Sequence, residues 1–112
     1  MDIVTADKWF TTHSCADDIT YICEPHILEF YRCNIWHVRG RDRDMLVDSG
    51  MGVVSLREQI PTLTERPLSA VASHTHFDHI GGHHEFDDRV VHRAEAEIMA
   101  SPSRRITLAD PY

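Results

Sequence analysis

Short apolar runs that alternate with polar residues recur along the chain and predict β-strands. Bulky apolar and β-branched residues dominate these runs, and polar or glycine-containing stretches separate them. The pattern predicts strands over residues 18–23, 33–39, 44–48, 68–73 and 89–92. Because residues 40–43 form a polar stretch that begins with glycine, the second and third of these strands should pair as a hairpin.

Helical spacing of apolar residues begins after the third strand. The spaced residues are Val53, Leu56, Ile60 and Leu63. Pro61 should break or restart this helix near Ile60, because proline has no amide hydrogen to donate. Residues 93–100 predict a second helix that Ser101 and Pro102 should end. The chain has no repeat, low-complexity tract or linker, so we expect residues 1–112 to belong to a single domain.

A dense group of metal-ligand side chains follows the strand over residues 68–73. His74 and His76 alternate, so in an extended segment both imidazoles point the same way and can share one ion. Asp78 and His79 fall where the chain turns, and they can face a second ion. Imidazole and carboxylate groups suit zinc, although iron and manganese accept them too. The alternative is that Asp78 caps a following helix and the histidines are solvated loop residues.

The order His-x-His-x-Asp-His, followed by Gly81-Gly82, resembles the signature of the metallo-β-lactamase fold superfamily. The resemblance implies an α/β fold: an αββα sandwich with helices outside two packed sheets and metals at one edge. It also implies two Zn²⁺ per complete site, with His74 and His76 on one ion, Asp78 and His79 on the other, and Asp78 as the catalytic residue. In that family the remaining ligands come from the second half of the domain. This chain, which has no histidine beyond residue 97, would then supply the first αβ half.

Asp48-Ser49-Gly50 resembles the Asp-(Ser/Thr)-Gly segment that ends an earlier strand in this superfamily. There the Asp supports the metal loop from behind, and Asp48 occupies its place. Ligating histidines need such a partner, because a carboxylate that accepts the second ring N–H fixes the tautomer and the ring orientation. The alternative is an Asx turn before a glycine-rich bend.

Two further segments, Arg66-Pro67-Leu68 and Ala94-Glu95-Ala96-Glu97, resemble acyl-CoA thioesterases of this superfamily. This resemblance implies a small-molecule thioester substrate, while the metal motif alone leaves thioester, ester and amide open. His83 and His84 depart from the thioesterase pattern. They follow the glycines closely enough for a substrate or metal-supporting role. An isolated histidine such as His37 is expected to be structural.

Composition and the order of residues indicate which partners, which cell compartment and which cysteine chemistry to expect. The 18 acidic and 11 basic residues give a formal net charge of −7, and the only adjacent basic pair is Arg104-Arg105, so we expect no nucleic-acid partner. No apolar run approaches the roughly 18 residues of a membrane span. The start lacks a secretory pattern, which favours the cytoplasm. The three cysteines show no Cys-x-x-Cys pair and are expected to be small buried thiols.

Two alternatives to a metal-dependent hydrolase stay open at this point. One is a noncatalytic metal-binding fragment or remnant, and the other is an iron-dependent redox relative. A first αβ half alone would expose the apolar face of its sheet. Its partner in completing the fold would therefore be a missing C-terminal half or a second copy in a homodimer.

Overall fold

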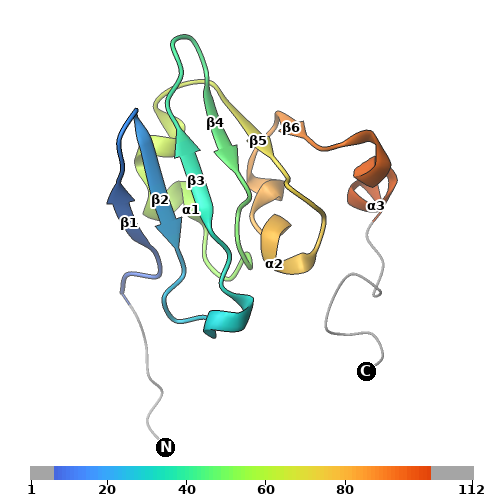
Figure 1. Ribbon diagram of the computed structural model, residues 1–112, viewed down its shortest axis with the longest axis horizontal. Coiled ribbons are helices and arrows are strands. Elements are labelled where there is room, and N and C mark those ends of the chain that lie inside the picture. The colour runs from blue at the N-terminus through green and yellow to red at the C-terminus, as the bar shows by residue number, and fades with distance from the viewer. Residues whose placement is uncertain (1–6, 102–112) are drawn as a thin grey trace, which may run out of the picture.

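A computed structural model describes residues 7–101 as one mixed β-sheet with short helices around it (Figure 1). The six strands stand side by side in chain order. They are β1 (Thr11–Ser14), β2 (Ile19–Cys23), β3 (Ile35–Val38), β4 (Asp44–Val47), β5 (Leu68–Val71) and β6 (Arg89–Val90). Strands β1 to β4 pair antiparallel, whereas β5 runs parallel to both β4 and β6. The predicted hairpin of residues 33–48 is therefore confirmed.

The crossover from β4 to β5 supplies the helices that cover one face of the sheet. It contains α1 (Leu56–Gln59) and the 3₁₀ helix η2 (Pro61–Thr64), so the expected break at Pro61 is confirmed. Ser55 caps α1 by accepting a hydrogen bond from the Glu58 amide. Apolar side chains from the helices and the strands form the core beneath: Phe10, Ile22, Cys33, Ile35, Leu46, Leu56, Ile60, Leu63, Ala70 and Phe86.

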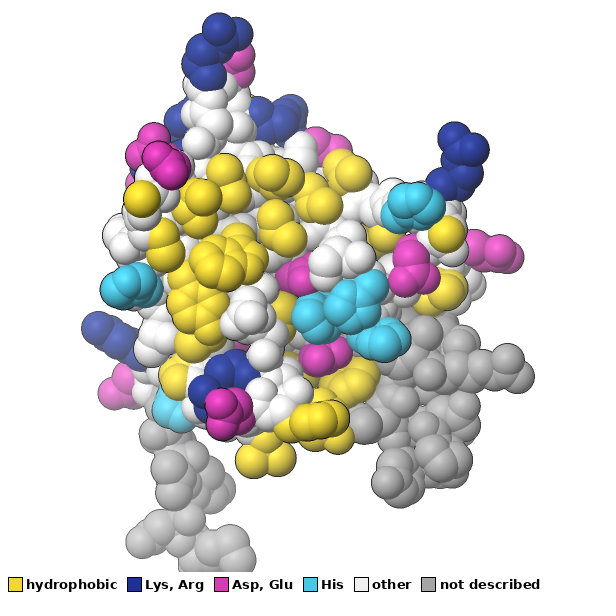
Figure 2. Space-filling model, viewed as in Figure 1, with side chains coloured by type: hydrophobic (Ala, Val, Ile, Leu, Met, Phe, Trp, Pro, Cys, Tyr) yellow, Lys and Arg dark blue, Asp and Glu magenta, His cyan; other side chains and the backbone are white. Residues whose placement is uncertain are grey.

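The opposite face of the sheet carries apolar side chains that are only partly covered. Tyr21 lies opposite Trp36 in the β2–β3 register, and their rings are 5.1 Å apart. Trp36 is 37% exposed and Met45, on β4, is 40% exposed. Figure 2 shows hydrophobic side chains gathered over β2 to β4, beside a group of histidine side chains. The sequence predicts an exposed apolar sheet face, and the partial exposure of Trp36 and Met45 shows one.

Several elements differ from the sequence-based expectations. Strand β5 ends at Val71, two residues early, so His74 and His76 lie in a loop rather than on an extended strand. This loop leads into α2 (Phe77–Ile80), whose N-cap residue is His76. Asp78 therefore lies inside the helix, and the alternative in which it caps one is wrong. Strand β1 and two 3₁₀ helices were also not expected: η1 (Glu29–Tyr31) and η3 (His83–Glu85). The predicted helix of residues 93–100 begins as a third 3₁₀ helix, η4 (Arg93–Glu95).

The C-terminal segment follows the predicted pattern more closely. Helix α3 (Ala96–Ala100) continues from η4 and ends before Ser101, as expected. In the part of the chain that the structure describes, no helix has the length and apolar character needed to cross a membrane. The basic pair Arg104-Arg105 lies outside the described residues, as does the start of the chain up to residue 6.

Candidate metal centre

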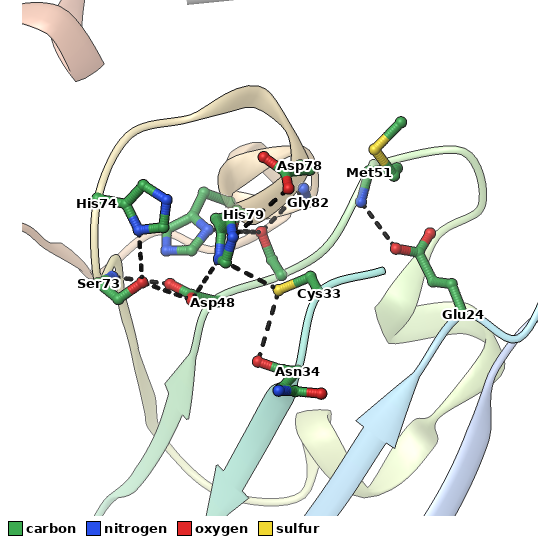
Figure 3. A network of polar contacts seen from close by, with 12 residues as sticks. Glu24, Cys33, Asn34, Asp48, Met51, Ser73, His74, Asp78, His79 and Gly82 are labelled. Carbon is green, nitrogen blue, oxygen red and sulfur yellow. Dashed lines mark hydrogen bonds and ion pairs between the residues drawn. The ribbon is translucent and has the colours of Figure 1, made fainter. Parts of the chain in front are cut away.

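The candidate site lies at the edge of the sheet where β4 and β5 end (Figure 3). Because these two strands are parallel, the segments that follow them leave from the same edge. Asp48 comes directly after β4, and the loop of residues 72–76 comes after β5. The topology thus places the two sequence motifs beside each other, although about 25 residues separate them.

The predicted metal ligands gather in this loop and in α2. The ring centroid of His74 lies 4.7 Å from that of His76 and 4.0 Å from that of His79. The Asp78 carboxylate Oδ2 lies 3.5 Å from Nε2 of His79. The side chains of Asp78 and His79 remain 18% and 23% exposed, so a small ion can reach both. All four predicted ligands therefore belong to one cluster open to solvent.

Asp48 connects the two motifs through its buried carboxylate. Its Oδ1 accepts a hydrogen bond from the Ser73 amide at 2.7 Å, and its Oδ2 accepts from the Ser73 hydroxyl at 2.6 Å. Oδ2 also lies 2.8 Å from Nδ1 of His79. The Asp48 backbone has a positive φ of 64°, a conformation that Asp tolerates better than most residues. The carboxylate thus connects β4 to the loop of residues 72–76 and to α2, whereas an Asx turn would have bonded it to residues nearby in the chain.

Glycines allow the two loops to approach closely. The Gly81 amide donates to the Gly50 carbonyl at 2.8 Å. A Cβ atom at Gly81 would come within 2.1 Å of the Met51 backbone, and one at Gly52 would come within 2.3 Å of the Gly81 carbonyl oxygen. The lack of a side chain at Gly81 therefore lets the end of α2 lie against the loop that follows Asp48.

Of the two histidines after the glycines, only His83 reaches this loop. Its ring is buried, and Nδ1 lies 2.6 Å from the Ser49 hydroxyl oxygen, which also accepts from the Gly82 amide. Burial lowers the pKa of His83, because the protonated ring would lose its hydration. His84 is exposed and makes no hydrogen bond within residues 7–101. A supporting role therefore fits the position of His83 but not that of His84.

A family model for the metallo-beta-lactamase superfamily matches residues 28–104, which include every residue of this cluster. The chain belongs to the metallo-β-lactamase superfamily. Its fold agrees with this membership. The metallo-β-lactamases of Erythrobacter litoralis and Pontibacter korlensis superpose with TM-scores of 0.61 and 0.65, at 21% and 15% identity. These superpositions cover 88% and 83% of this chain and 48% of each solved structure, so the chain has the fold of about half of such a domain.

Among curated proteins, the chain is similar to acyl-coenzyme A thioesterase MBLAC2. It is 40% identical to the human protein over 109 residues and 38% identical to the chicken protein over 105. The matches cover 87% and 86% of this chain. They cover 39% and 38% of those relatives, so the chain spans about two fifths of their length.

The donor set fits a divalent metal ion of the kind this superfamily binds. With Nδ1 of His79 turned to Asp48, the other ring nitrogen, Nε2, faces Asp78. Nδ1 of His74 lies 3.0 Å from the Ser73 hydroxyl, which leaves its Nε2 available as well. Neutral imidazoles with one nitrogen occupied by a supporting bond are the usual form of histidine metal ligands. These nitrogen and oxygen donors suit zinc, iron and manganese alike.

No pattern in the sequence predicted that two further residues, Glu24 and Cys33, would lie at this edge of the sheet. Buried Glu24 accepts hydrogen bonds from the indole Nε1 of Trp9 at 2.8 Å and from the Met51 amide at 2.9 Å, and so braces the glycine loop. Cys33, also buried, places Sγ 3.5 Å from Nδ1 of His79. Both contacts join residues far apart in the chain, so no local pattern could have revealed them. The expectation of buried thiols is confirmed for Cys23 and Cys33 but is wrong for exposed Cys15.

Cys33, Asp48 and His79 also form a second arrangement of metal-ligand atoms. Within residues 7–101 they are the only three such side chains whose ligand atoms lie within 4.8 Å of one another. Burial and the charge of Asp48 raise the pKa of the Cys33 thiol to about 12, so it stays protonated at neutral pH. Cys33 Sγ and Asp48 Oδ2 both lie beside the same atom, Nδ1 of His79, at 3.5 Å and 2.8 Å. Because Nε2 of His79 faces Asp78, we interpret Cys33 and Asp48 as support for His79.

Proposed function

We propose that this chain carries the metal-binding loop of a metal-dependent hydrolase that cleaves acyl-CoA thioesters. The observation that carries the proposal is the cluster of three imidazoles and one carboxylate fixed by Asp48 at the sheet edge. The thioester class follows from the 40% identity to a human acyl-CoA thioesterase. The chain would contribute the first αβ half of the sandwich, and the second sheet would cover the apolar face around Trp36.

Each residue of the cluster has a separate task in this proposal. His74 and His76 would hold one Zn²⁺, and Asp78 and His79 would hold the other. When bound, such ions generate hydroxide from water near neutral pH and polarise the carbonyl of the substrate. Asp48 accepts a hydrogen bond from Nδ1–H of His79 and so keeps the Nε2 lone pair directed away from the core. Asp78 is the proposed catalytic residue. Its carboxylate lies on the solvent-exposed side of His79, 3.5 Å from Nε2.

An apolar loop beside the motif supports a substrate with an acyl chain. Leu28 and Phe30 are 73% and 87% exposed, which is unusual for side chains of this size. The Phe30 ring packs edge-on against Tyr31 at 4.9 Å, and Tyr31 lies 6.1 Å from Phe77, inside the metal motif. This row of rings leads from the candidate metal ligands to the surface. An acyl chain lying along it would remove apolar surface from water.

The proposal can be tested by exchanging segments with a relative. In human acyl-coenzyme A thioesterase MBLAC2, the matched segment is replaced by this chain and zinc is added. Release of free CoA thiol from palmitoyl-CoA is then measured. We expect hydrolysis, and a loss of more than about 100-fold in Asp78→Ala, because even supporting residues behind metal ligands are worth about 10–100-fold. Asp87→Ala, which removes an exposed carboxylate nine positions later, should keep the rate.

A Phe30→Ser variant of the same chimera tests the acyl-chain surface. It should raise KM for palmitoyl-CoA more than for acetyl-CoA, since only the longer chain reaches this ring. A folded chimera that binds zinc and yet hydrolyses no thioester would contradict the assignment. Equal rates in the Asp78→Ala variant would instead remove Asp78 from the reaction.

A further inference from the structure

The thiol of Cys33 occupies an unexpected position beside the candidate metal ligands (Figure 3). Cys33 precedes β3 and belongs to neither sequence motif, yet it is only 2% exposed and contacts a histidine 46 residues later. Sγ lies 3.5 Å from Nδ1 of His79 and 3.5 Å from the Asn34 carbonyl oxygen. The thiol therefore lies between the core of the sheet and the candidate metal loop.

Nδ1 of His79 consequently has two neighbours on the side away from the open cluster. Asp48 Oδ2 is 2.8 Å away and can only accept a hydrogen bond when ionised. The Cys33 thiol donates its proton to the Asn34 carbonyl, which leaves a sulfur lone pair facing the same ring nitrogen. Both neighbours thus act as acceptors for one N–H. This arrangement stabilises the tautomer with the proton on Nδ1 and the lone pair on Nε2.

We propose that Cys33 is a positioning residue for His79: it is a second acceptor for the Nδ1 proton, and it holds the ring so that Nε2 faces Asp78. This inference rests on the proposed role of His79 as a metal ligand. With Asp48 as its only partner, the His79 ring could still rotate about the axis of that hydrogen bond. The Cys33 sulfur adds a second contact to Nδ1 from the segment before β3, and this contact restricts the rotation. Cys33 touches neither substrate nor metal in this proposal.

Two substitutions at Cys33 separate hydrogen bonding from packing. Cys33→Val keeps an apolar side chain of similar size but removes the acceptor, whereas Cys33→Ser keeps an acceptor in a smaller side chain. Cys23→Val is the matched control, because Cys23 is a buried thiol of the same sheet that contacts the Thr11 hydroxyl instead of the motif. Thermal unfolding of each full-length variant shows whether packing has been preserved.

The first measurement is the His79 tautomer in the metal-free chain, from long-range ¹H–¹⁵N NMR correlations of the ring. We expect the proton on Nδ1 in the wild type, in Cys33→Ser and in Cys23→Val. In Cys33→Val a second tautomer should become populated. A wild-type ring with its proton on Nε2 would overturn the proposal, as would tautomer populations in Cys33→Val that match the wild type.

The second measurement is zinc affinity, from competition with a fluorescent chelator. We expect a weakening of about 10-fold in Cys33→Val, the lower end of the range for supporting residues, and less than about 2-fold in Cys33→Ser. A thiolate-to-metal charge-transfer band in the Co²⁺-loaded wild type, absent in Cys33→Ser, would overturn the proposal by making Cys33 a ligand. Neither measurement uses a substrate. Failure of the thioesterase assignment would therefore leave these results unchanged.

Discussion

Asp48 combines an unfavourable backbone conformation with a side chain that makes three polar contacts in the candidate site. Its φ of 64° turns the carboxylate away from β4 and toward Ser73 and His79. A non-glycine residue in this region costs of order 1–3 kcal/mol unless its surroundings stabilise it. Here the two hydrogen bonds from Ser73 and the contact with His79 offset that cost. The strained backbone of Asp48 therefore places its carboxylate where it can orient His79, a candidate metal ligand.

Replacing Asp48 by Asn separates these two effects, because Asn also tolerates positive φ. The amide preserves the backbone turn, but its NH₂ group opposes the Nδ1–H of His79. We expect Asp48→Asn to weaken zinc binding by about 10–100-fold while changing the free energy of unfolding little. Asp48→Ala should lose both affinity and stability. Chelator competition and urea unfolding provide the two measurements, and unchanged zinc affinity in Asp48→Asn would contradict the supporting role.

The buried ring of His83 predicts a pH dependence of stability. Its pKa is lowered from the ordinary value of 6.5 in the folded chain, so the unfolded chain binds a proton first as the pH falls. The contribution of His83 to stability is therefore fully present above about pH 6.5 and is lost as the pH decreases toward the folded-state pKa. One such group can change the free energy of unfolding by at most about 1.4 kcal/mol per pH unit.

Substitution by Asn tests this dependence. His83→Asn keeps a polar group beside the Ser49 hydroxyl but does not titrate, so its free energy of unfolding should fall less between pH 7.5 and pH 5.5 than that of the wild type. His84→Asn, at the exposed neighbouring position, should behave as the wild type does. Urea unfolding at the two pH values gives the comparison. Parallel changes in all three proteins would show that His83 does not contribute.

At the scale of elements, the β3–β4 hairpin contains a buried hydrogen-bonded pair, His37 and Asp44, outside the candidate metal site. His37 Nε2 lies 3.0 Å from Asp44 Oδ2, and the two side chains are 3% and 1% exposed. Burial raises the pKa of Asp44, but the hydrogen bonds from His37 and the Gly40 amide, with the nearby charge of Arg66, outweigh it and lower the pKa below 3.8. This hairpin contribution to stability is therefore present above about pH 3.9 and is lost as the pH falls through the folded-state pKa.

Removing the Asp44 carboxylate should lower the free energy of unfolding strongly. Asp44→Asn leaves the His37 and Arg66 side chains without their carboxylate, and we expect a loss of about 3 kcal/mol or more in the free energy of unfolding. The matched control is Asp42→Asn on the same turn, whose pair with Arg41 is exposed at 79% and 92%. That change should stay within about 0.5 kcal/mol. Urea denaturation at pH 7 compares the variants, and equal losses would contradict the importance of burial.

At the scale of the whole molecule, the sheet is covered on one face and partly bare on the other. Helix α1 and η2 pack over Ile35 and Leu46, while the other face presents Trp36 and Met45. Exposed aromatic and sulfur-containing side chains of this kind favour association with another surface. The purified chain should therefore self-associate in sedimentation velocity experiments.

A single charge on the bare face should weaken this association. We expect Trp36→Lys to raise the dissociation constant by about 10-fold or more, because large aromatic residues dominate such contacts. Thr62→Lys adds the same charge on η2, on the helix-covered side, and should leave association unchanged. A wild-type chain that sediments as a monomer at every concentration would contradict this expectation.

The sequence by itself determined the features that depend on neighbouring residues. Short runs of apolar and β-branched residues predicted five of the six strands, and four of these five, β2 to β5, contain buried residues. Pro61 marked the end of α1. Spacing of metal-ligand types identified the loop after β5, since donors for one ion must lie close together. Strand β1 escaped detection because all four of its residues are exposed, so it has no apolar alternation to show.

Only the tertiary structure decided which distant residues contact the candidate metal ligands. His83 and His84 are adjacent and identical in type, and the orientation of η3 alone buries one and exposes the other. Cys33 lies beside His79 because three paired strands bring the start of β3 to the edge where β4 and β5 end. Such contacts depend on strand order and register, which a single sequence encodes only through the packing of the whole sheet.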